Sequence, residues 1–89
     1  MLQKTIIIQN TLGLHARASA KLVNLANKFL SKIELCRDDE CINAKSIMGI
    51  MLLAASKGSV LNLIVDGKDE KKALKEIVAL IENKFNEKD

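Results

Sequence analysis

The chain has 89 residues, enough for one core and too few for a second, so we expect residues 1–89 to form a single domain. Hydrophobic residues make up 48% of the chain, but Trp and Tyr are absent and Phe occurs twice, so the core must be mainly aliphatic. Fourteen Lys and Arg against eleven Asp and Glu give a net charge of +3. The basic residues are scattered and lack stacking aromatics, which argues against nucleic-acid binding, and a mild positive charge suits contact with acidic proteins.

The start of the chain predicts a strand, a loop and a helix. Residues 5–9 are mainly β-branched, which is typical of a strand, and residues 11–14 form a loop around Gly13. Over residues 16–29 four apolar side chains recur on one helical face: Leu22, Leu25, Ala26 and Phe29. The first residues lack the pattern of a signal peptide, and no apolar run approaches the roughly 18 residues of a membrane helix. We therefore expect a cytoplasmic protein without membrane insertion.

A hairpin follows the first helix. Residues 32–37 alternate apolar and polar, and a two-residue turn at Asp38-Asp39 returns the chain so that Leu35 pairs with Ile42. The same register puts Cys36 opposite Cys41. A reducing cytosol favours two free thiols over a disulfide, and we assign them no function. Two Cys without a nearby His do not form a zinc site, and we expect no metal or other cofactor.

The second half predicts a short helix, a strand and a long helix. Ser46 is a good N-cap for an almost wholly apolar helix over residues 47–55, and residues 60–65 form a buried strand. A turn at residues 66–69 starts the last helix, whose apolar side carries Leu74, Ile77, Val78, Ile81 and Phe85. The order β-α-β-β-α-β-α predicts an α+β fold, with one antiparallel sheet and helices on a single face. Ferredoxin-like and other small folds share this outline, so the fold alone does not assign a function.

The only His of the chain, His15, lies where a loop meets the start of the first helix. A helix start offers unpaired N–H groups and the positive end of the helix dipole, which together bind anions. The dipole disfavours the imidazolium, so a ring nitrogen keeps its lone pair as a nucleophile. A phosphoryl group on the ring would face the amides of Ala16 and Arg17 and pair with the Arg17 guanidinium. Most single His residues near a helix start have no such role, so a second signal is needed.

The second signal is the apolar helix that follows Ser46. A one-layer sheet buries only one side of it, which leaves Ile47, Met48 and Met51 partly exposed beside the helix of His15. Adaptable Met and Ile side chains suit a surface that docks several partners. Ordinary core packing explains the same residues equally well.

Two motifs together resemble a known family. Gly13-Leu14-His15-Ala16-Arg17, followed by Ser19-Ala20, and Lys45-Ser46-Ile47-Met48-Gly49-Ile50-Met51 resemble the histidine-containing phosphocarrier family, HPr, of the bacterial phosphoenolpyruvate-dependent phosphotransferase system. The resemblance spans nearly the whole chain and implies an open-faced β-sandwich with a four-stranded antiparallel sheet. It also implies a phosphoryl carrier rather than an independent catalyst. His15 would accept a phosphoryl group on Nδ1 from Enzyme I and pass it to IIA domains, while Arg17 stabilises it.

The resemblance further implies a docking surface and a regulatory site in a protein that we expect to be a monomer. The docking patch for Enzyme I and the IIA domains would comprise Ala16, Ala20, Ile47, Met48 and Met51. Ser46 matches the serine that HPr kinase/phosphorylase modifies in some bacteria. A phosphate there is favourable at a helix start, but it places negative charge beside the patch and opposes an acidic partner.

One departure and two alternatives stay open. The family usually has Pro where this chain has Ala18, which predicts a changed transfer rate or phosphohistidine lifetime and leaves the carbohydrate and nitrogen-type branches open. A purely regulatory HPr-like protein would act by binding, with Ser46 as its switch and His15 idle. In a ferredoxin-like interaction module the His15 motif would be incidental. No Ser/His/Asp set or paired carboxylates indicate an independent enzyme, and no acid–base partner of His15 is visible in the sequence.

Overall fold

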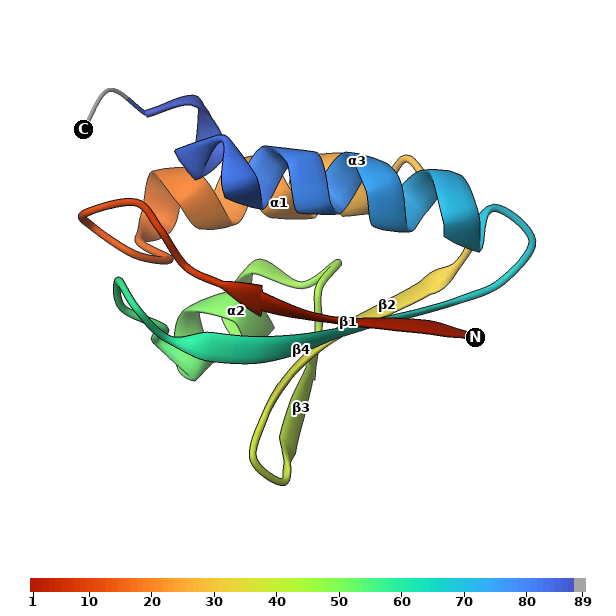
Figure 1. The fold of residues 1–89 in the computed structure, drawn as a ribbon, viewed down its shortest axis with the longest axis horizontal. Coiled ribbons are helices and arrows are strands. Elements are labelled where there is room, and N and C mark those ends of the chain that lie inside the picture. The colour runs from red at the N-terminus through yellow and green to blue at the C-terminus, as the bar shows by residue number, and fades with distance from the viewer. Residues whose placement is uncertain (88–89) are drawn as a thin grey trace.

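A computed structural model of the chain describes residues 1–87, in which two helices lie side by side on one face of a sheet (Figure 1). The elements in chain order are β1 (Leu2–Ile7), α1 (Ala16–Ala26), β2 (Lys32–Arg37), β3 (Glu40–Asn43), α2 (Ile47–Leu53), β4 (Val60–Asp66), α3 (Glu70–Glu82) and the helical turn η1 (Lys84–Asn86). This order confirms the predicted α+β fold. None of the helices within residues 1–87 has the length and apolar composition needed to cross a membrane.

The four strands form one antiparallel sheet in the order β1-β4-β2-β3. β4 therefore lies inside the sheet, where it pairs with β1 on one side and with β2 on the other. β3 returns beside β2 with Leu35 opposite Ile42, which confirms the register predicted from the turn. α1 and α3 cover one face of this sheet, and α2 packs against α1 and β3.

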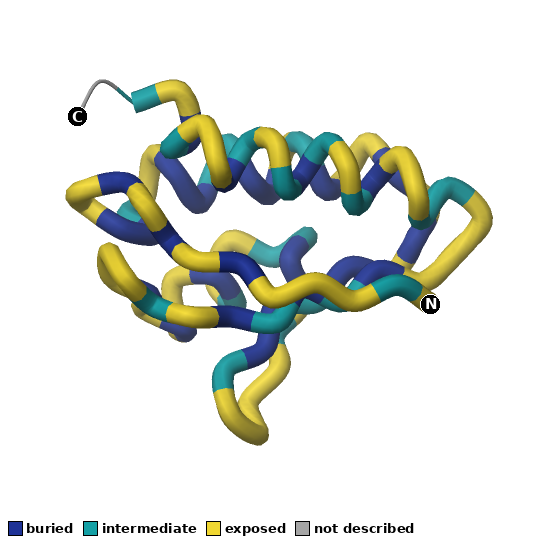
Figure 2. Tube along the Cα trace, in the orientation of Figure 1, coloured by how far each residue is buried: buried dark blue, intermediate teal, exposed yellow. Residues whose placement is uncertain are grey.

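The core lies between the sheet and the helices (Figure 2). Inward residues of β2 and β4 are buried, and outward residues such as Val60 are exposed, as the period of two requires, whereas the edge strand β3 has no buried residue. Both Phe side chains join the aliphatic core, and its largest fully buried members are Phe85, Ile8, Leu22, Ile33, Leu35, Ile50, Leu53, Leu61, Leu63, Ile77, Ile81 and Val65. Aliphatic packing therefore holds the helices that carry the site.

Helix and strand ends differ from the predicted ones by a few residues. β1 begins at Leu2 because its pairing with β4 continues past the β-branched run. α1 ends at Ala26, and Phe29 reaches the core from the loop that follows. α2 ends at Leu53, where Ala54 adopts a left-handed conformation with φ of 49°. These ends are set by tertiary contacts and caps that local periodicity does not encode.

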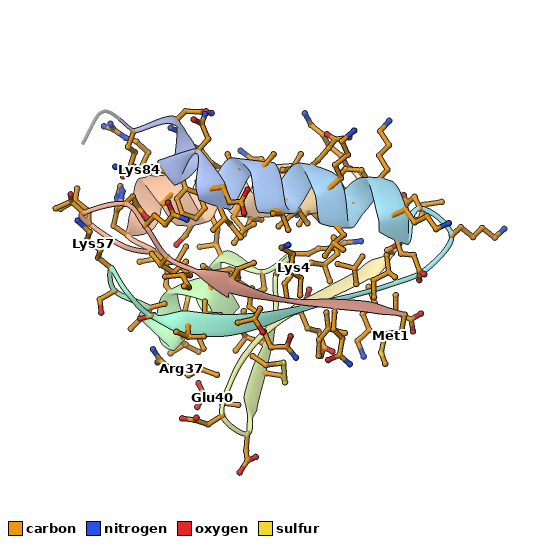
Figure 3. The ribbon with its side chains drawn as sticks, viewed as in Figure 1. Met1, Lys4, Arg37, Glu40, Lys57 and Lys84 are labelled. Atoms are coloured by element: carbon orange, nitrogen blue, oxygen red, sulfur yellow. A yellow bond between two sulfur atoms is a disulfide. The ribbon has the colours of Figure 1, made fainter. Side chains whose placement is uncertain are left out.

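Cys36 and Cys41 form a disulfide across the β2–β3 hairpin (Figure 3), so the prediction of two free thiols is wrong. The register puts the two residues directly opposite each other with their Cα atoms 4.0 Å apart, which brings the two sulfurs within bonding reach. The neighbouring Arg37 guanidinium donates a hydrogen bond to the Leu53 carbonyl. The hairpin is thereby tied to the carboxyl end of α2.

Candidate functional site

A tight loop between β1 and α1 brings His15 to the helix start. Gly13 has a φ of +64°, and a Cβ at this position would lie 2.5 Å from the Ala55 carbonyl oxygen and 2.8 Å from the Ser56 Cα. The backbones approach this closely because the Leu14 N–H donates to the same Ala55 carbonyl at 2.8 Å. Only glycine fits both the backbone angle and the space. It determines where the next residues lie.

His15 is the N-cap residue of α1. Its backbone is extended, with φ of −74° and ψ of 178°, and its side chain makes no capping hydrogen bond. The backbone N–H groups of Ala16, Arg17 and Ala18 have no hydrogen-bond acceptor among residues 1–87. The first turn of α1 therefore presents free donors at the positive end of the helix dipole, which is an anion-binding arrangement.

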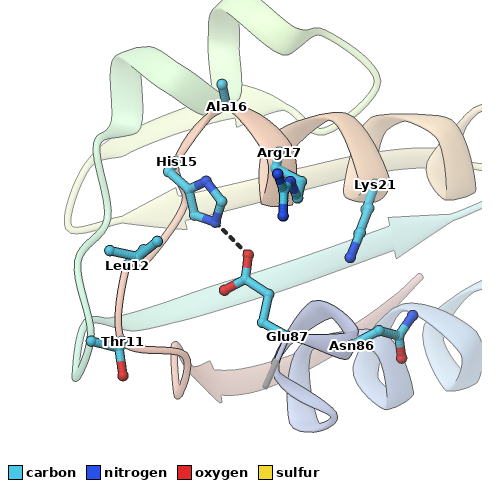
Figure 4. A pocket seen from close by; sticks show the side chains of 8 residues that line it. All are labelled: Thr11, Leu12, His15, Ala16, Arg17, Lys21, Asn86 and Glu87. Atoms are coloured by element: carbon cyan, nitrogen blue, oxygen red, sulfur yellow. Dashed lines mark hydrogen bonds and ion pairs between the residues drawn. The ribbon is translucent and has the colours of Figure 1, made fainter. Parts of the chain in front are cut away.

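The imidazole opens onto a pocket built from three parts of the chain (Figure 4). The His15 side chain is 27% exposed, so a partner can reach it. The pocket is lined by Thr11, Leu12, His15, Ala16, Arg17, Lys21, Asn86 and Glu87. Among the described residues of the pocket, the cations Arg17 and Lys21 lie one helical turn apart on α1 and favour an anion in the pocket.

Glu87 is an acid–base partner of His15 that the sequence analysis missed. Its Oε2 pairs with the imidazole Nε2, and its Oε1 accepts a hydrogen bond of 2.9 Å from the Asn10 side-chain amide. Asn10 is fully buried and also donates to the Gly13 carbonyl at 2.8 Å, so it joins the loop before His15 to the end of the chain. A separation of 72 residues from His15 carries no periodic signal, so only the fold could reveal this contact.

The apolar side chains expected at the surface are exposed there. Ile47 is 42% exposed, Met48 70% and Met51 45%, on the helix that packs against α1. Ala16 is exposed and Ala20 is half-buried on α1 itself. Near the site, the exposed side chains of Leu52 on α2 and Leu12 beside the pocket were not predicted. We call the five predicted residues the docking patch, a role that stays a prediction.

Ser46 caps α2 as predicted. Its Oγ accepts a hydrogen bond of 3.2 Å from the Gly49 N–H, and its backbone is extended, as at an N-cap. The Ser46 residue is only partly buried. A group attached to Oγ can therefore extend into solvent from the start of the helix.

The two candidate phosphorylation sites lie at opposite ends of α1. The Leu14–Ala55 hydrogen bond joins the start of α1 to the segment that follows α2. At the other end, the Lys45 ammonium, just before α2, donates to the Phe29 carbonyl at 2.6 Å. α1 and α2 are therefore antiparallel, and the 11 residues of α1 span roughly 16 Å at 1.5 Å per residue. Arg17 shares a pocket with His15, whereas Ser46 does not.

Comparison with known proteins identifies relatives over the full length of the chain. The family model PTS-HPr, described as the PTS HPr component phosphorylation site, matches residues 2–83. The phosphocarrier protein HPr of Cupriavidus necator is 52% identical over 87 residues, which cover 98% of each chain. The match to the family model ends before the segment that carries Glu87.

Solved structures give the same result. The crystal structure of HPr-C-His from Thermoanaerobacter tengcongensis superposes with a TM-score of 0.95 at 50% identity and covers 99% of each chain. A crystal structure of an HPr dimer from the same organism has a TM-score of 0.79, also at 50% identity, and covers 98% of this chain and all of that one. The chain belongs to the HPr family of phosphocarrier proteins of the bacterial phosphotransferase system.

Proposed function

We propose that this protein accepts a phosphoryl group on Nδ1 of His15 from phosphorylated Enzyme I and passes it to a IIA domain. The observation that carries the proposal is the partly exposed imidazole at a helix start whose first three N–H groups are free within the described chain. Figure 4 shows Nε2 turned toward Glu87 and the other ring nitrogen turned toward the first turn of α1. A phosphoryl group on Nδ1 would lie beside these donors.

The chemistry needs little beyond this arrangement. The Nδ1 lone pair attacks phosphorus while the bond from phosphorus to the donor breaks, and negative charge spreads over the phosphoryl oxygens. The amides of Ala16 and Arg17 and the cations of Arg17 and Lys21 would stabilise that charge. The same contacts hold the phosphorylated product, and the open pocket leaves phosphorus accessible to the next protein.

Incubation with phosphoenolpyruvate and Enzyme I tests the proposal. We expect an acid-labile, alkali-stable phosphate that His15→Ala abolishes. Arg17→Met should slow its formation by roughly 10- to 100-fold, since it removes one charge-assisted partner of the phosphoryl group. Lys75→Met, which removes an equal charge from the exposed side of α3, is the control and should leave the rate unchanged. Labelling that persists in His15→Ala would refute the assignment.

We further propose that the docking patch binds Enzyme I and the IIA domains in turn and that the working protein is a monomer. The exposed Met and Ile side chains beside α1 support the docking role, because soft apolar side chains adapt to different partners. The dimer of the T. tengcongensis relative makes oligomeric state a separate question. Sedimentation at the concentration of the transfer assay decides it, and a dimer there would refute the monomer.

Regulation at Ser46 is a second proposal, with HPr kinase/phosphorylase as the partner. A phosphate on Oγ would remain at the positive end of α2, where the Gly49 N–H donates at present. Its charge would lie beside Ile47 and Met48 and oppose an acidic partner at the patch. Incorporation from ATP should persist in His15→Ala and vanish in Ser46→Ala. If ATP labels Ser46 while Enzyme I never labels His15, the purely regulatory alternative holds.

A further inference from the structure

An unusual turn at the end of the chain delivers Glu87 to the active-site ring. α3 ends at Glu82, and then Lys84, Phe85 and Asn86 have φ values of 53°, 55° and 62°. Three consecutive residues with side chains rarely adopt this left-handed conformation, because Cβ crowds the backbone. Surrounding contacts must therefore hold the turn in place.

Those contacts come from the core and from the loop of the site. Phe85 is fully buried, which anchors the middle of the turn. The Lys21 ammonium donates to the Phe85 carbonyl at 2.6 Å, and the buried Asn10 amide holds one carboxylate oxygen of Glu87. The other carboxylate oxygen is thereby aimed at Nε2 of His15, and the Glu87 side chain is only 13% exposed.

We infer that Glu87 is a positioning residue that keeps a proton on Nε2 of His15. This proton directs the phosphoryl group to Nδ1 and keeps the phosphorylated ring able to transfer that group. The statement about the proton on Nε2 is independent of the proposed function, and the statement about phosphoryl transfer rests on it. An ionised carboxylate only accepts hydrogen bonds, so its partner Nε2 must carry the proton. In the neutral ring the lone pair then belongs to Nδ1.

The proton on Nε2 matters for both directions of transfer. When the N–P bond forms, the donor keeps the electron pair of the bond that breaks, Nδ1 becomes quaternised and the ring turns cationic without losing a proton. When the phosphoryl group leaves, the N–P electron pair returns to Nδ1 and a neutral imidazole departs. Without the Nε2 proton the leaving group would be an imidazolate anion, a far stronger base. A carboxylate at Nε2 stabilises the cationic ring and so preserves the better leaving group.

The charges around the ring are divided between its two nitrogens. Arg17 and the free amides of the first turn of α1 lie on the side where a phosphoryl group would bind, whereas the Lys21 ammonium lies farther along the pocket, at the Phe85 carbonyl. Among the residues of the pocket that the structure describes, Glu87 is the only acidic one, and it contacts the opposite nitrogen. The positive groups would therefore stabilise the phosphoryl group, and the carboxylate of Glu87 would stabilise the ring.

The first test needs no phosphoryl donor. The ¹⁵N shifts of the two ring nitrogens, measured at a pH where the ring is neutral, report which one carries the proton. We expect the Nε2–H form to dominate in the full chain and a mixture of both forms in Glu87→Ala. Glu82→Gln, an exposed carboxylate earlier in the same segment, is the matched control and should leave the full-chain pattern unchanged. An unchanged pattern in Glu87→Ala would overturn the inference.

The second test uses phosphoramidate, a small phosphoryl donor that acts without Enzyme I. Nδ1 is the more hindered nitrogen, since it adjoins the ring carbon that bears Cβ, yet we expect ³¹P–¹⁵N coupling to Nδ1 in the full chain and a larger Nε2 product in Glu87→Ala. Equal regiochemistry in the full chain and in Glu87→Ala would overturn the inference. Failure of Enzyme I to label His15 would refute only the proposed function.

Discussion

The substitution Gly13→Ala tests the loop that positions His15. A left-handed backbone costs an alanine roughly 1–2 kcal/mol. The new Cβ would also lie 2.5 Å from the Ala55 carbonyl oxygen and 2.8 Å from the Ser56 Cα, both of them backbone atoms that cannot rotate away. The two segments must separate, which breaks the 2.8 Å hydrogen bond from Leu14 to Ala55, worth about 1 kcal/mol. We expect a total loss of about 2–3 kcal/mol in the free energy of unfolding.

Gly58→Ala is the matched control, because Gly58 has a φ of +90° but a Cβ there meets nothing within 4 Å. It should cost only the conformational term of roughly 1–2 kcal/mol. Urea denaturation of both variants measures the difference, and thermal melts should separate them by several degrees, since 1 kcal/mol shifts the Tm of a domain this size by about 4–8 °C. Phosphorylation of His15 should slow in Gly13→Ala and not in Gly58→Ala. Equal stabilities would show that the close approach at Gly13 does not constrain the loop.

Three further predictions concern the rest of the molecule. Hydrogen bonds from the Ser31 hydroxyl and from the backbone N–H groups of Leu30 and Ser31 lower the pKa of Asp69, so its stabilising effect is present at neutral pH and is lost as the pH falls through the lowered pKa. Asp69→Asn should therefore be less stable at neutral pH, and its free energy of unfolding, measured by urea denaturation, should fall less steeply as the pH is lowered. An unaltered pH dependence would show that the hydrogen bonds of Asp69 are not the cause. Reduction of the Cys36–Cys41 disulfide should lower the stability by up to about 2 kcal/mol, since the closed loop is short, and the double Ser variant should show no further change with dithiothreitol. Met48→Glu should slow phosphorylation by Enzyme I about tenfold without loss of stability, whereas Leu30→Glu, an exposed position outside the docking patch, should not.

Most of the fold could be predicted from local sequence patterns. The alternation in residues 32–37 and the Asp38-Asp39 turn predicted the hairpin register, because side-chain period and turn length leave only one pairing. Ser46 was recognisable as an N-cap from its residue type and the apolar run that follows it. The chemistry of a helix start predicts an anion site at His15 and Arg17; this role stays a prediction, and the structure places both residues in one pocket.

Contacts between distant segments could not be predicted in the same way. Phe85 continued the apolar stripe of the last helix in the sequence, but the chain leaves the helix after Glu82 and buries Phe85 through a left-handed turn. Local propensity argues against such a turn, so only the core and the hydrogen bonds around it specify it. The turn determines the position of Glu87, so the contact of Glu87 with His15 could not be predicted either. The disulfide was missed for another reason, because register permits the bond but the redox environment was taken to oppose it.

The place of β4 inside the sheet has a consequence for when the protein can fold during synthesis. β1 leaves the ribosome first, but its hydrogen-bonding neighbour β4 is completed only at Asp66. Until then the hairpin of β2 and β3 can form locally, but β1 has no strand to pair with, and the apolar faces of these strands remain exposed to solvent. Joining strands so far apart in the chain is slow compared with local pairing. The nascent chain can therefore complete its four-stranded sheet only after β4 has been made, and a chain that stops short of β4 has only the β2–β3 hairpin.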